Sequence, residues 1–325
     1  MTTEVLQPPK LSTARLFLLG ASSVILCLSY LMAVFAPFPV AMAVVLYGRA
    51  RGYGVGLLGL ALSVPLGFQM TGDYTLAMSF SALMVFAVII AETLLRSWRP
   101  VRAIVIAGVI CLTVFAAFFA YTMYVSKTTP INFFAEQIAQ AQSKLVAAKE
   151  AGKFEQDLAQ IGLGGKPADI AQEILKVVPG YLFMGTFFVL WVNMFLALKG
   201  QRLLRTETSV AHDERALLGF KMPFECAYLV AISLALVVGA EYWQLAWAEP
   251  VGINLLRMLG IFYFFQGFGV LLDYLNHFGV LGMLRTIIVM AIVFIMPQLI
   301  AVLGLFDTWF DFTKKIQKKT FKENL

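Results

Sequence analysis

Charged residues are scarce in this chain. They make up 14% of its 325 residues, whereas 60% of the residues are hydrophobic. An average soluble domain carries about 25% charged residues. A soluble fold could not withdraw so much apolar surface from water. The shortage of charge therefore excludes an ordinary soluble domain and predicts that lipid solvates part of the surface.

Cysteine and histidine are also few, and their positions do not fit a metal site. The cysteines Cys27, Cys111 and Cys226 are far apart and lie inside or at the start of apolar runs, and the histidines are His212 and His277. This spacing matches no Cys/His metal motif. We expect the cysteines to pack as small apolar side chains in helices, and we expect neither a metal nor a cofactor.

The sequence likewise lacks the marks of an enzyme or of a nucleic-acid-binding protein. No Ser/His pair, paired aspartates or histidine cluster falls within the apolar runs. The net charge of +6 comes from Lys and Arg between and after these runs, as in the loops of a membrane protein. The glycine-rich stretch 52–56 has no preceding strand, so it does not fit a phosphate-binding loop. We expect a membrane protein that is not an enzyme and has no nucleic-acid partner.

What the sequence does contain is a series of long apolar runs. A helix needs about 20 apolar residues to cross the hydrocarbon core of a bilayer. The runs predict an all-α fold, a polytopic transmembrane helix bundle of eight to nine segments that forms a single membrane domain over residues 1–325. The predicted segments are 16–36, 38–48, 55–71, 74–95, 101–125, 178–199, 224–247, 252–277 and 280–304.

Basic residues predict the orientation of this bundle. Lys and Arg gather in the N-terminal tail, around residue 50, in 96–102 and in 199–223. Positive charge marks the cytoplasmic loops of membrane proteins, so we expect these parts and the N-terminus to be cytoplasmic. The polar stretch 126–177 then forms an extracytoplasmic helical insertion, with an amphipathic helix over 132–149.

The C-terminal end conflicts with this topology. Residues 305–325 form a basic amphipathic tail with five lysines. Nine crossings from a cytoplasmic N-terminus would place these lysines outside, against the charge bias. A re-entrant hairpin would restore a cytoplasmic tail, and the glycines within 266–269 make the segment 252–277 our candidate for it. The alternative for 252–277 is a plain kinked span.

Polar residues inside the predicted spans are the candidate ligand-binding residues, because charge is costly in hydrocarbon. Asp273 and His277 are four apart and share a helix face. Asp273 and Arg285 lie at equal distances from a turn near Gly279, so we expect an ion pair, either as a clamp between helices or as part of a site. The aromatic residues beside Gln266 either line an apolar pocket or face lipid. The candidate set is Asn193, Arg257, Gln266, Asp273, His277 and Arg285.

Small residues open the third predicted segment. Gly52 and Gly56 are four apart, and this spacing lets helix backbones approach closely in lipid. The pattern favours packing within the protein. The alternative is a docking face for a partner protein.

Two stretches resemble a known family. Tyr263-Phe264-Phe265-Gln266-Gly267, followed by an apolar run, and Gly304–Phe312 are similar to the YybS-like family of bacterial membrane proteins, whose domain is labelled as of unknown function. The layout is similar over nearly the whole chain, although Thr313 stands where that family prefers Arg. The family is grouped with the S components of energy-coupling-factor transporters. The resemblance implies a subunit of the bacterial cytoplasmic membrane that captures a vitamin or a metal.

Two functions follow as alternatives. The first is a transporter-type subunit that binds a small solute in a pocket lined by Arg257, Gln266 and Asp273. Because the chain has no ATP-binding motif, this subunit would need an energising ATPase module or another membrane partner. The second is a non-transporting scaffold with a dry, well-packed core that recruits partner proteins. In both cases the lipid bilayer surrounds the bundle.

Overall fold

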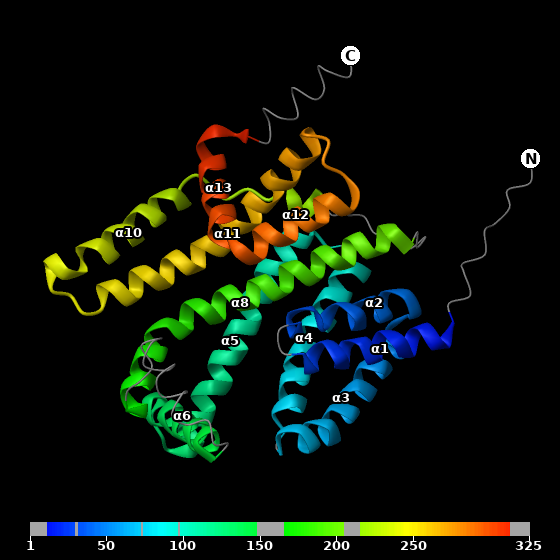
Figure 1. Cartoon of the computed structure of the whole chain (residues 1–325), viewed down its shortest axis with the longest axis horizontal. Coiled ribbons are helices and arrows are strands. Elements are labelled where there is room, and N and C mark those ends of the chain that lie inside the picture. The colour runs from blue at the N-terminus through cyan, green and yellow to red at the C-terminus, as the bar shows by residue number, and fades with distance from the viewer. Residues whose placement is uncertain are drawn as a thin grey trace, which may run out of the picture. The chain divides into compact units, whose positions relative to one another are not determined.

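The computed structural model describes residues 12–29, 32–72, 74–96, 98–147, 166–204 and 215–312, and this part of the chain contains helices and no strand (Figure 1). The predicted all-α fold is therefore confirmed. The elements are α1 (Thr13–Leu28), η1 (Ala33–Phe35), α2 (Pro37–Tyr47), α3 (Arg49–Thr71), α4 (Thr75–Leu95), α5 (Pro100–Ser126), α6 (Pro130–Ala147), α8 (Pro167–Leu204), α9 (Arg215–Leu218), α10 (Cys226–Trp243), α11 (Ala248–His277), α12 (Gly282–Ile295) and α13 (Pro297–Phe310).

Contacts divide the chain into two compact units. The first unit comprises Met1–Gly108, Thr186–Lys221 and Tyr263–Leu325, and the second comprises Val109–Gly185 and Met222–Phe262. Helices α5, α8 and α11 continue from one unit into the other, so the division falls inside helices and not at a linker. The single membrane domain expected from the sequence stays a prediction.

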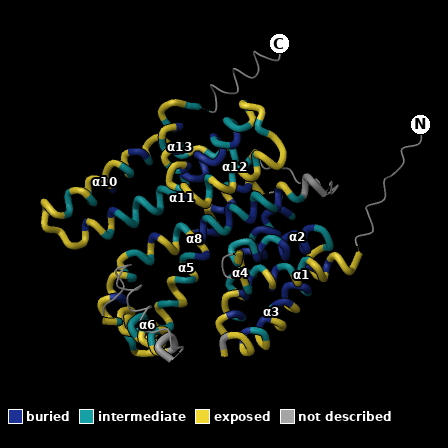
Figure 2. The backbone as a smooth tube through the Cα atoms, in the orientation of Figure 1, coloured by how far each residue is buried: buried dark blue, intermediate teal, exposed yellow. Residues whose placement is uncertain are grey.

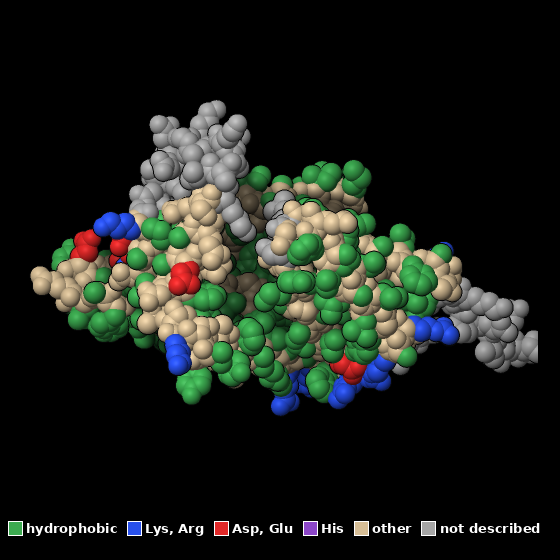
Figure 3. All heavy atoms as spheres, turned by 90° about the horizontal axis from the view of Figure 1, so that it is seen from below, with side chains coloured by type: hydrophobic (Ala, Val, Ile, Leu, Met, Phe, Trp, Pro, Cys, Tyr) green, Lys and Arg blue, Asp and Glu red, His purple; other side chains and the backbone are tan. Residues whose placement is uncertain are grey.

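Within the described residues, six helices are long and apolar enough to cross a membrane, or seven if the bent pair α12 and α13 is counted as one span. The predicted count of eight to nine is not confirmed, because α1 ends at Leu28 and α2 has only 11 residues, a length of about 17 Å. Hydrophobic side chains occupy much of the surface seen in Figure 3, and the charged side chains on that face stand in small groups. The six helices with these properties are α3, α4, α5, α8, α10 and α11.

Helices α1 and α2 form a short antiparallel hairpin in the first unit. The hydroxyl of Tyr47, at the end of α2, donates to the carbonyl of Ser12 before α1 (3.0 Å), and Ser23 donates to the carbonyl of Ala36 (2.6 Å). Residues 40–44 of α2 are at most 2% exposed (Figure 2). The short helix α2 is therefore covered by its neighbours.

Glycines at the start of α3 are used for packing within the first unit. A Cβ atom added to Gly52 would overlap the backbone of Val44 in α2, and one added to Gly56 would overlap the side chain of Met84 in α4. The close approach predicted from the i, i+4 spacing is thus made to helices of the same chain. This contact occupies the face that the scaffold hypothesis reserved for a partner protein.

The polar stretch after α5 contains a helix in the second unit. Helix α6 covers most of the predicted amphipathic segment, and Phe133 and Phe134 each lie 6.1 Å from the ring of Phe119 in α5. The end of the same polar stretch, from Pro167 on, is the first part of the long helix α8. Residues 148–165 lie outside the described residues, and the extracytoplasmic position of 126–177 stays a prediction.

The break in the C-terminal region does not lie where the sequence analysis placed it. Helix α11 is continuous through Gln266–Gly269, so the interpretation of 252–277 as re-entrant is wrong. The chain bends by 98° at Met296, before Pro297. Proline removes a backbone donor and disfavours helical conformation at the preceding residue, and Met296 has φ −139° and ψ 55°.

Both ends of the bent pair lie beside the last turns of α11. Near the start of α12, Arg285 donates to Asn276 (2.6 Å), and after α13 the ring of Phe312 lies 6.2 Å from that of Tyr274. Each helix has 14 residues, about 21 Å, which is shorter than the roughly 30 Å of the hydrocarbon core. Such a bent pair is either one broken span or a re-entrant hairpin, and its contacts with one end of α11 favour the hairpin.

Two glycines let α13 cross α11 at backbone contact. A Cβ at Gly267 would overlap the carbonyl oxygen of Ile300, and a Cβ at Gly304 would overlap that of Tyr263. Of the two glycines that seemed to mark a break in α11, Gly267 therefore marks the surface on which α13 packs, and Gly269 lies against the backbone of Leu218 in α9.

The hairpin predicts the side of the C-terminal tail. In a protein whose native cysteines are replaced by alanine, Phe278→Cys and Thr320→Cys should react with a membrane-impermeant maleimide from the same side, because the chain returns to the end of α11 where it began. Labelling of intact and inverted vesicles measures this. Reaction from opposite sides would show that α12 and α13 together cross the bilayer.

The crossing also predicts a difference between two glycines of α11. Gly267→Ala should lower the free energy of unfolding by about 1–3 kcal/mol, because the added methyl group overpacks the contact with Ile300. Gly260→Ala is the matched control: the space around Gly260 is open, so this change should be neutral or stabilise by up to about 1 kcal/mol. Thermal unfolding in detergent gives both values. Equal effects would contradict the crossing.

Candidate functional site

Helix α8 contains a proline that interrupts its hydrogen bonds inside the second unit. Pro179 has no N–H group, which leaves the carbonyl of Leu175 without its usual helical donor. One residue later, the side chain of Asn254 from α11 accepts a hydrogen bond from the Gly180 N–H (2.9 Å) and donates to the carbonyl of Lys176 (2.6 Å). These two backbone groups would bond each other in an uninterrupted helix, so Asn254 bridges the helix at its break.

Arg257 lies one turn beyond Asn254, against the same stretch of α8. Its guanidinium sits over the ring of Tyr181, 4.2 Å from the ring centre. The lack of a side chain at Gly180 permits this approach, since an added Cβ would lie 3.1 Å from Arg257 Cδ. The Nη1 atom of Arg257 is buried and has no hydrogen-bond partner among the described residues.

The position of Arg257 makes this arrangement chemically unusual. Arg257 is the tenth residue of α11, roughly 14 Å along a helix that is apolar enough to span a bilayer. A buried donor without an acceptor costs about 1–3 kcal/mol, and more when it is charged. The stacked tyrosine supplies a favourable electrostatic contact but no lone pair for the N–H group. The group that would satisfy Nη1 is therefore an oxyanion or another strong acceptor.

A second polar cluster, in the first unit, is satisfied by the protein itself. Asp307 of α13 is 1% exposed and accepts a hydrogen bond from Gln266 Nε2 (3.0 Å). Lys221 Nζ lies 3.8 Å from the same carboxylate and 2.5 Å from Asp311 Oδ1. This network ties α11 and the end of α13 to the segment before α10. We interpret this network as structural, because the buried amide of Gln266 and the buried carboxylate of Asp307 bind each other.

Aromatic side chains pack tightly around Gln266. Phe265 stacks on Trp191 of α8 at 4.8 Å between ring centres, and Phe268 meets the same indole edge-on at 4.9 Å. Tyr263, Phe264 and Phe265 are all at most 6% exposed. The interpretation of these residues as a face toward lipid is wrong, because they are buried among other aromatic side chains, and a pocket lining stays a prediction.

The remaining candidates make local contacts in the first unit. Asn193 is fully buried and donates to the carbonyls of Val34 (2.7 Å) and Val189 (2.8 Å). Arg285 donates to Asn276, and no direct ion pair joins it to Asp273 in the described part of the chain. The ring of His277 lies 5.7 Å from that of Phe278. The expected Asp273–Arg285 pair is therefore absent as a contact.

The candidate set is divided between the two units. Gln266 and Asp273 belong to the first unit and Arg257 to the second, and each has its own set of contacts. Sequence reasoning found Arg257 but missed Asn254, which lies in the same predicted segment, and Asp307, which had been assigned to the tail. The signal for Asp307 was its position three residues after Gly304, on the same face of an apolar helix.

Comparison with known proteins gives one family. A family model described as "Predicted membrane protein (DUF2232)" matches residues 13–308. Searches of curated proteins and of solved structures gave no match. The match supports a membrane protein family, whereas the finer resemblance to the YybS-like family and to transporter S components stays a prediction.

The bridge made by Asn254 predicts a stability effect. Asn254→Ala should lower the free energy of unfolding by about 1–3 kcal/mol, because it leaves backbone groups at the break of α8 without the side-chain amide. Asn132→Ala, at an exposed position of α6, is the control and should change it by less than about 0.5 kcal/mol. Thermal unfolding of the detergent-solubilised variants measures the difference. A neutral Asn254→Ala variant would show that α8 does not depend on this bridge.

Proposed function

The chain belongs to this family of predicted membrane proteins, and from that premise we propose that it is a transporter-type subunit that binds a small anionic solute at Arg257. The observation that carries the proposal is the buried Nη1 atom of Arg257, which has no partner among the described residues. Ionisable groups inside membrane helices are costly and are commonly placed where a substrate or ion uses them.

The energetics favour a ligand over a purely structural role. A structural arginine in a membrane helix gains from acceptors that satisfy its N–H groups, as the Asp307 carboxylate does for Gln266. Arg257 instead has an aromatic face beneath it and an unsatisfied donor. A carboxylate or phosphate group bound to Nη1 would form a charge-assisted hydrogen bond in a poorly hydrated environment.

The helix beside Arg257 supports the same proposal. Transporters commonly bind solutes where spanning helices are interrupted, because the freed backbone groups point into the site. Helix α8 is interrupted at Pro179, which frees the carbonyl of Leu175, and Asn254 holds the neighbouring backbone in place. A positive side chain beside an interrupted helix suits a solute that carries an anionic group.

The proposal extends to partners and location. The chain has no ATP-binding motif, so active transport would need an energising ATPase module, as expected for an S-component-like subunit. A bacterial cytoplasmic membrane with a cytoplasmic N-terminus fits the charge bias of the sequence. The scaffold alternative is weaker, because Gly52 and Gly56 already pack against the chain's own helices.

Replacing Arg257 tests the proposal. Purified protein is screened by thermal shift against monocarboxylates, dicarboxylates and inorganic phosphate, with native mass spectrometry for co-purified anions. Arg257→Met should abolish the ligand response. Its melting temperature without ligand should change little, because a lost cation–π contact of about 0.5–2 kcal/mol is offset by the removal of an unsatisfied donor.

Arg102→Met is the matched control for this experiment. Arg102 is an exposed arginine at the start of α5, and its replacement should leave the ligand response intact. A ligand response that survives in Arg257→Met would overturn the assignment of the site. A large loss of stability in Arg257→Met, with no anion bound by the unaltered protein, would identify Arg257 as a structural residue.

A further inference from the structure

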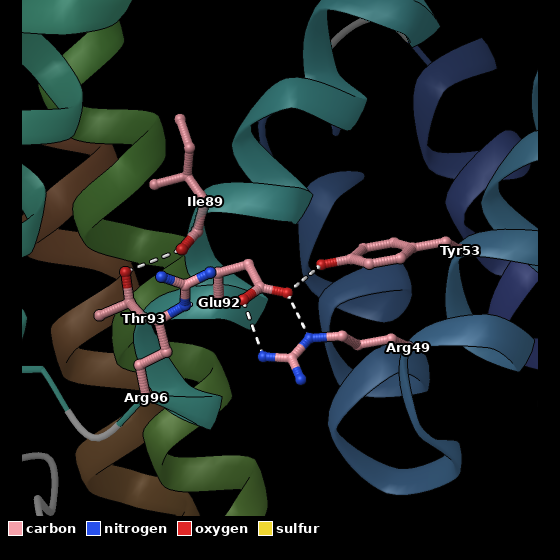
Figure 4. Close-up of polar contacts among 6 residues, drawn as sticks. All are labelled: Arg49, Tyr53, Ile89, Glu92, Thr93 and Arg96. Atoms are coloured by element: carbon pink, nitrogen blue, oxygen red, sulfur yellow. Dashed lines mark hydrogen bonds and ion pairs between the residues drawn. The ribbon is translucent and has the colours of Figure 1, made fainter.

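Two arginines converge on one carboxylate where α3 begins and α4 ends. Glu92 accepts hydrogen bonds from Arg49 Nε (2.7 Å) and Nη2 (2.9 Å), from the Tyr53 hydroxyl (3.0 Å) and from Arg96 Nε (3.0 Å). Figure 4 shows Arg49 and Tyr53 reaching from one helix, and Arg96 from the other, toward the same carboxylate. The contact between Glu92 and Arg96 follows from their spacing of four residues at the end of one helix, whereas the contacts across to α3 are set by the fold.

The Glu92 carboxylate has used its capacity to accept hydrogen bonds, whereas the two guanidinium groups keep unused donors. Each oxygen of Glu92 accepts two hydrogen bonds, which fills its usual capacity. Arg49 uses two of its N–H groups and Arg96 uses one, so each guanidinium keeps further donors. The side chains of Arg49 and Arg96 are 55% and 56% exposed, whereas that of Glu92 is 21% exposed. The remaining donors therefore belong to exposed side chains that are held by a half-buried carboxylate.

The surrounding charge is positive. Glu92 is the one acidic residue within the described part of 49–108, and it is shared by two arginines. Exposed arginines occupy three nearby positions in the sequence: Arg51, Arg99 and Arg102. Since one carboxylate cannot neutralise two guanidinium groups, the cluster keeps a net positive charge that is held in a fixed orientation.

The cluster lies at the depth of lipid headgroups. It stands at the ends of two helices that are apolar and long enough to span the bilayer. The ring of Trp98 lies 5.4 Å from the Arg96 guanidinium and is 53% exposed, as in the aromatic belts of membrane interfaces. At this depth, phospholipids present phosphate oxygens to arginine donors, and anionic phospholipids add the net negative charge that a positive cluster attracts.

We propose that Arg49 and Arg96, held in position by Glu92 and Tyr53, form a binding site for the phosphate group of an anionic phospholipid. Arginine suits this ligand because its planar group can bind two phosphate oxygens at once. Glu92 is a positioning residue in this site. It orients the two guanidinium groups and does not touch the lipid.

Replacing Glu92 distinguishes a site with oriented guanidinium groups from non-specific attraction between the protein and anionic lipid. Glu92→Gln makes the protein more positive by one charge, so non-specific attraction predicts stronger binding of anionic lipid. The organised site predicts weaker binding, by about fivefold, because the guanidinium groups lose their anchor. Arg51→Gln is the control: it removes one charge without touching the cluster and should leave binding nearly unchanged.

Native mass spectrometry of the full-length protein measures retained phosphatidylglycerol against phosphatidylcholine, with inorganic phosphate as a competitor. We expect retention of phosphatidylglycerol, little competition by phosphate, and loss in Glu92→Gln. Should Glu92→Gln fail to fold, Arg49→Lys with Arg96→Lys keeps the charge but not the forked geometry and should show the same loss. Retention that is unchanged or increased in these variants would overturn the site, and displacement by inorganic phosphate would identify free phosphate as the ligand.

Discussion

The backbone contact between Gly267 of α11 and Gly304 of α13 is the constraint on which the C-terminal part of the first unit depends. A side chain at either position would overlap a carbonyl of the other helix. Because the helices touch at these glycines, Asp307 is brought to Gln266 and buried with it. A carboxylate at 1% exposure is tolerable in a membrane helix because the amide and the ammonium group of Lys221 compensate it.

The same crossing explains the course of the chain. Helix α12 leaves from beside the end of α11, the chain bends at Met296, and α13 returns along α11 to reach Tyr274 and Lys221. A re-entrant position of this pair would place the C-terminal tail on the side of the basic segment 199–223, as the charge bias of the sequence predicts. The conflict in the predicted topology would then be removed.

The sequence predicted most of the long helices, because runs of about 20 apolar residues have few alternatives. It did not predict which segment is broken. Glycines in an apolar helix mark either a break or a close helix contact, and for Gly267 the second meaning holds because Ile300 lies against it. Arg257 was predicted as a site residue from its charge alone. Asn254 could not be, since its role depends on the Pro179 break in a helix distant in sequence.

The polar residues of the spans differ in how completely the protein satisfies them, and this difference carries the functional account. Gln266 and Asp307 bind each other, and Asn193 donates to two carbonyls and lacks only a partner for its Oδ1. Arg257 alone among the predicted site residues combines a full charge with a buried donor that has no partner in the described part of the chain. A protein that keeps such a group in hydrocarbon bears a cost that an anionic solute would remove.

The most direct test of this claim is an electron cryo-microscopy map of the protein in lipid nanodiscs with the bound anion present. The account predicts non-protein density within hydrogen-bonding distance of Arg257 Nη1, beside the break at Pro179, and no such density for Arg257→Met. A map in which a side chain or carbonyl of the protein itself satisfies Nη1 would contradict it.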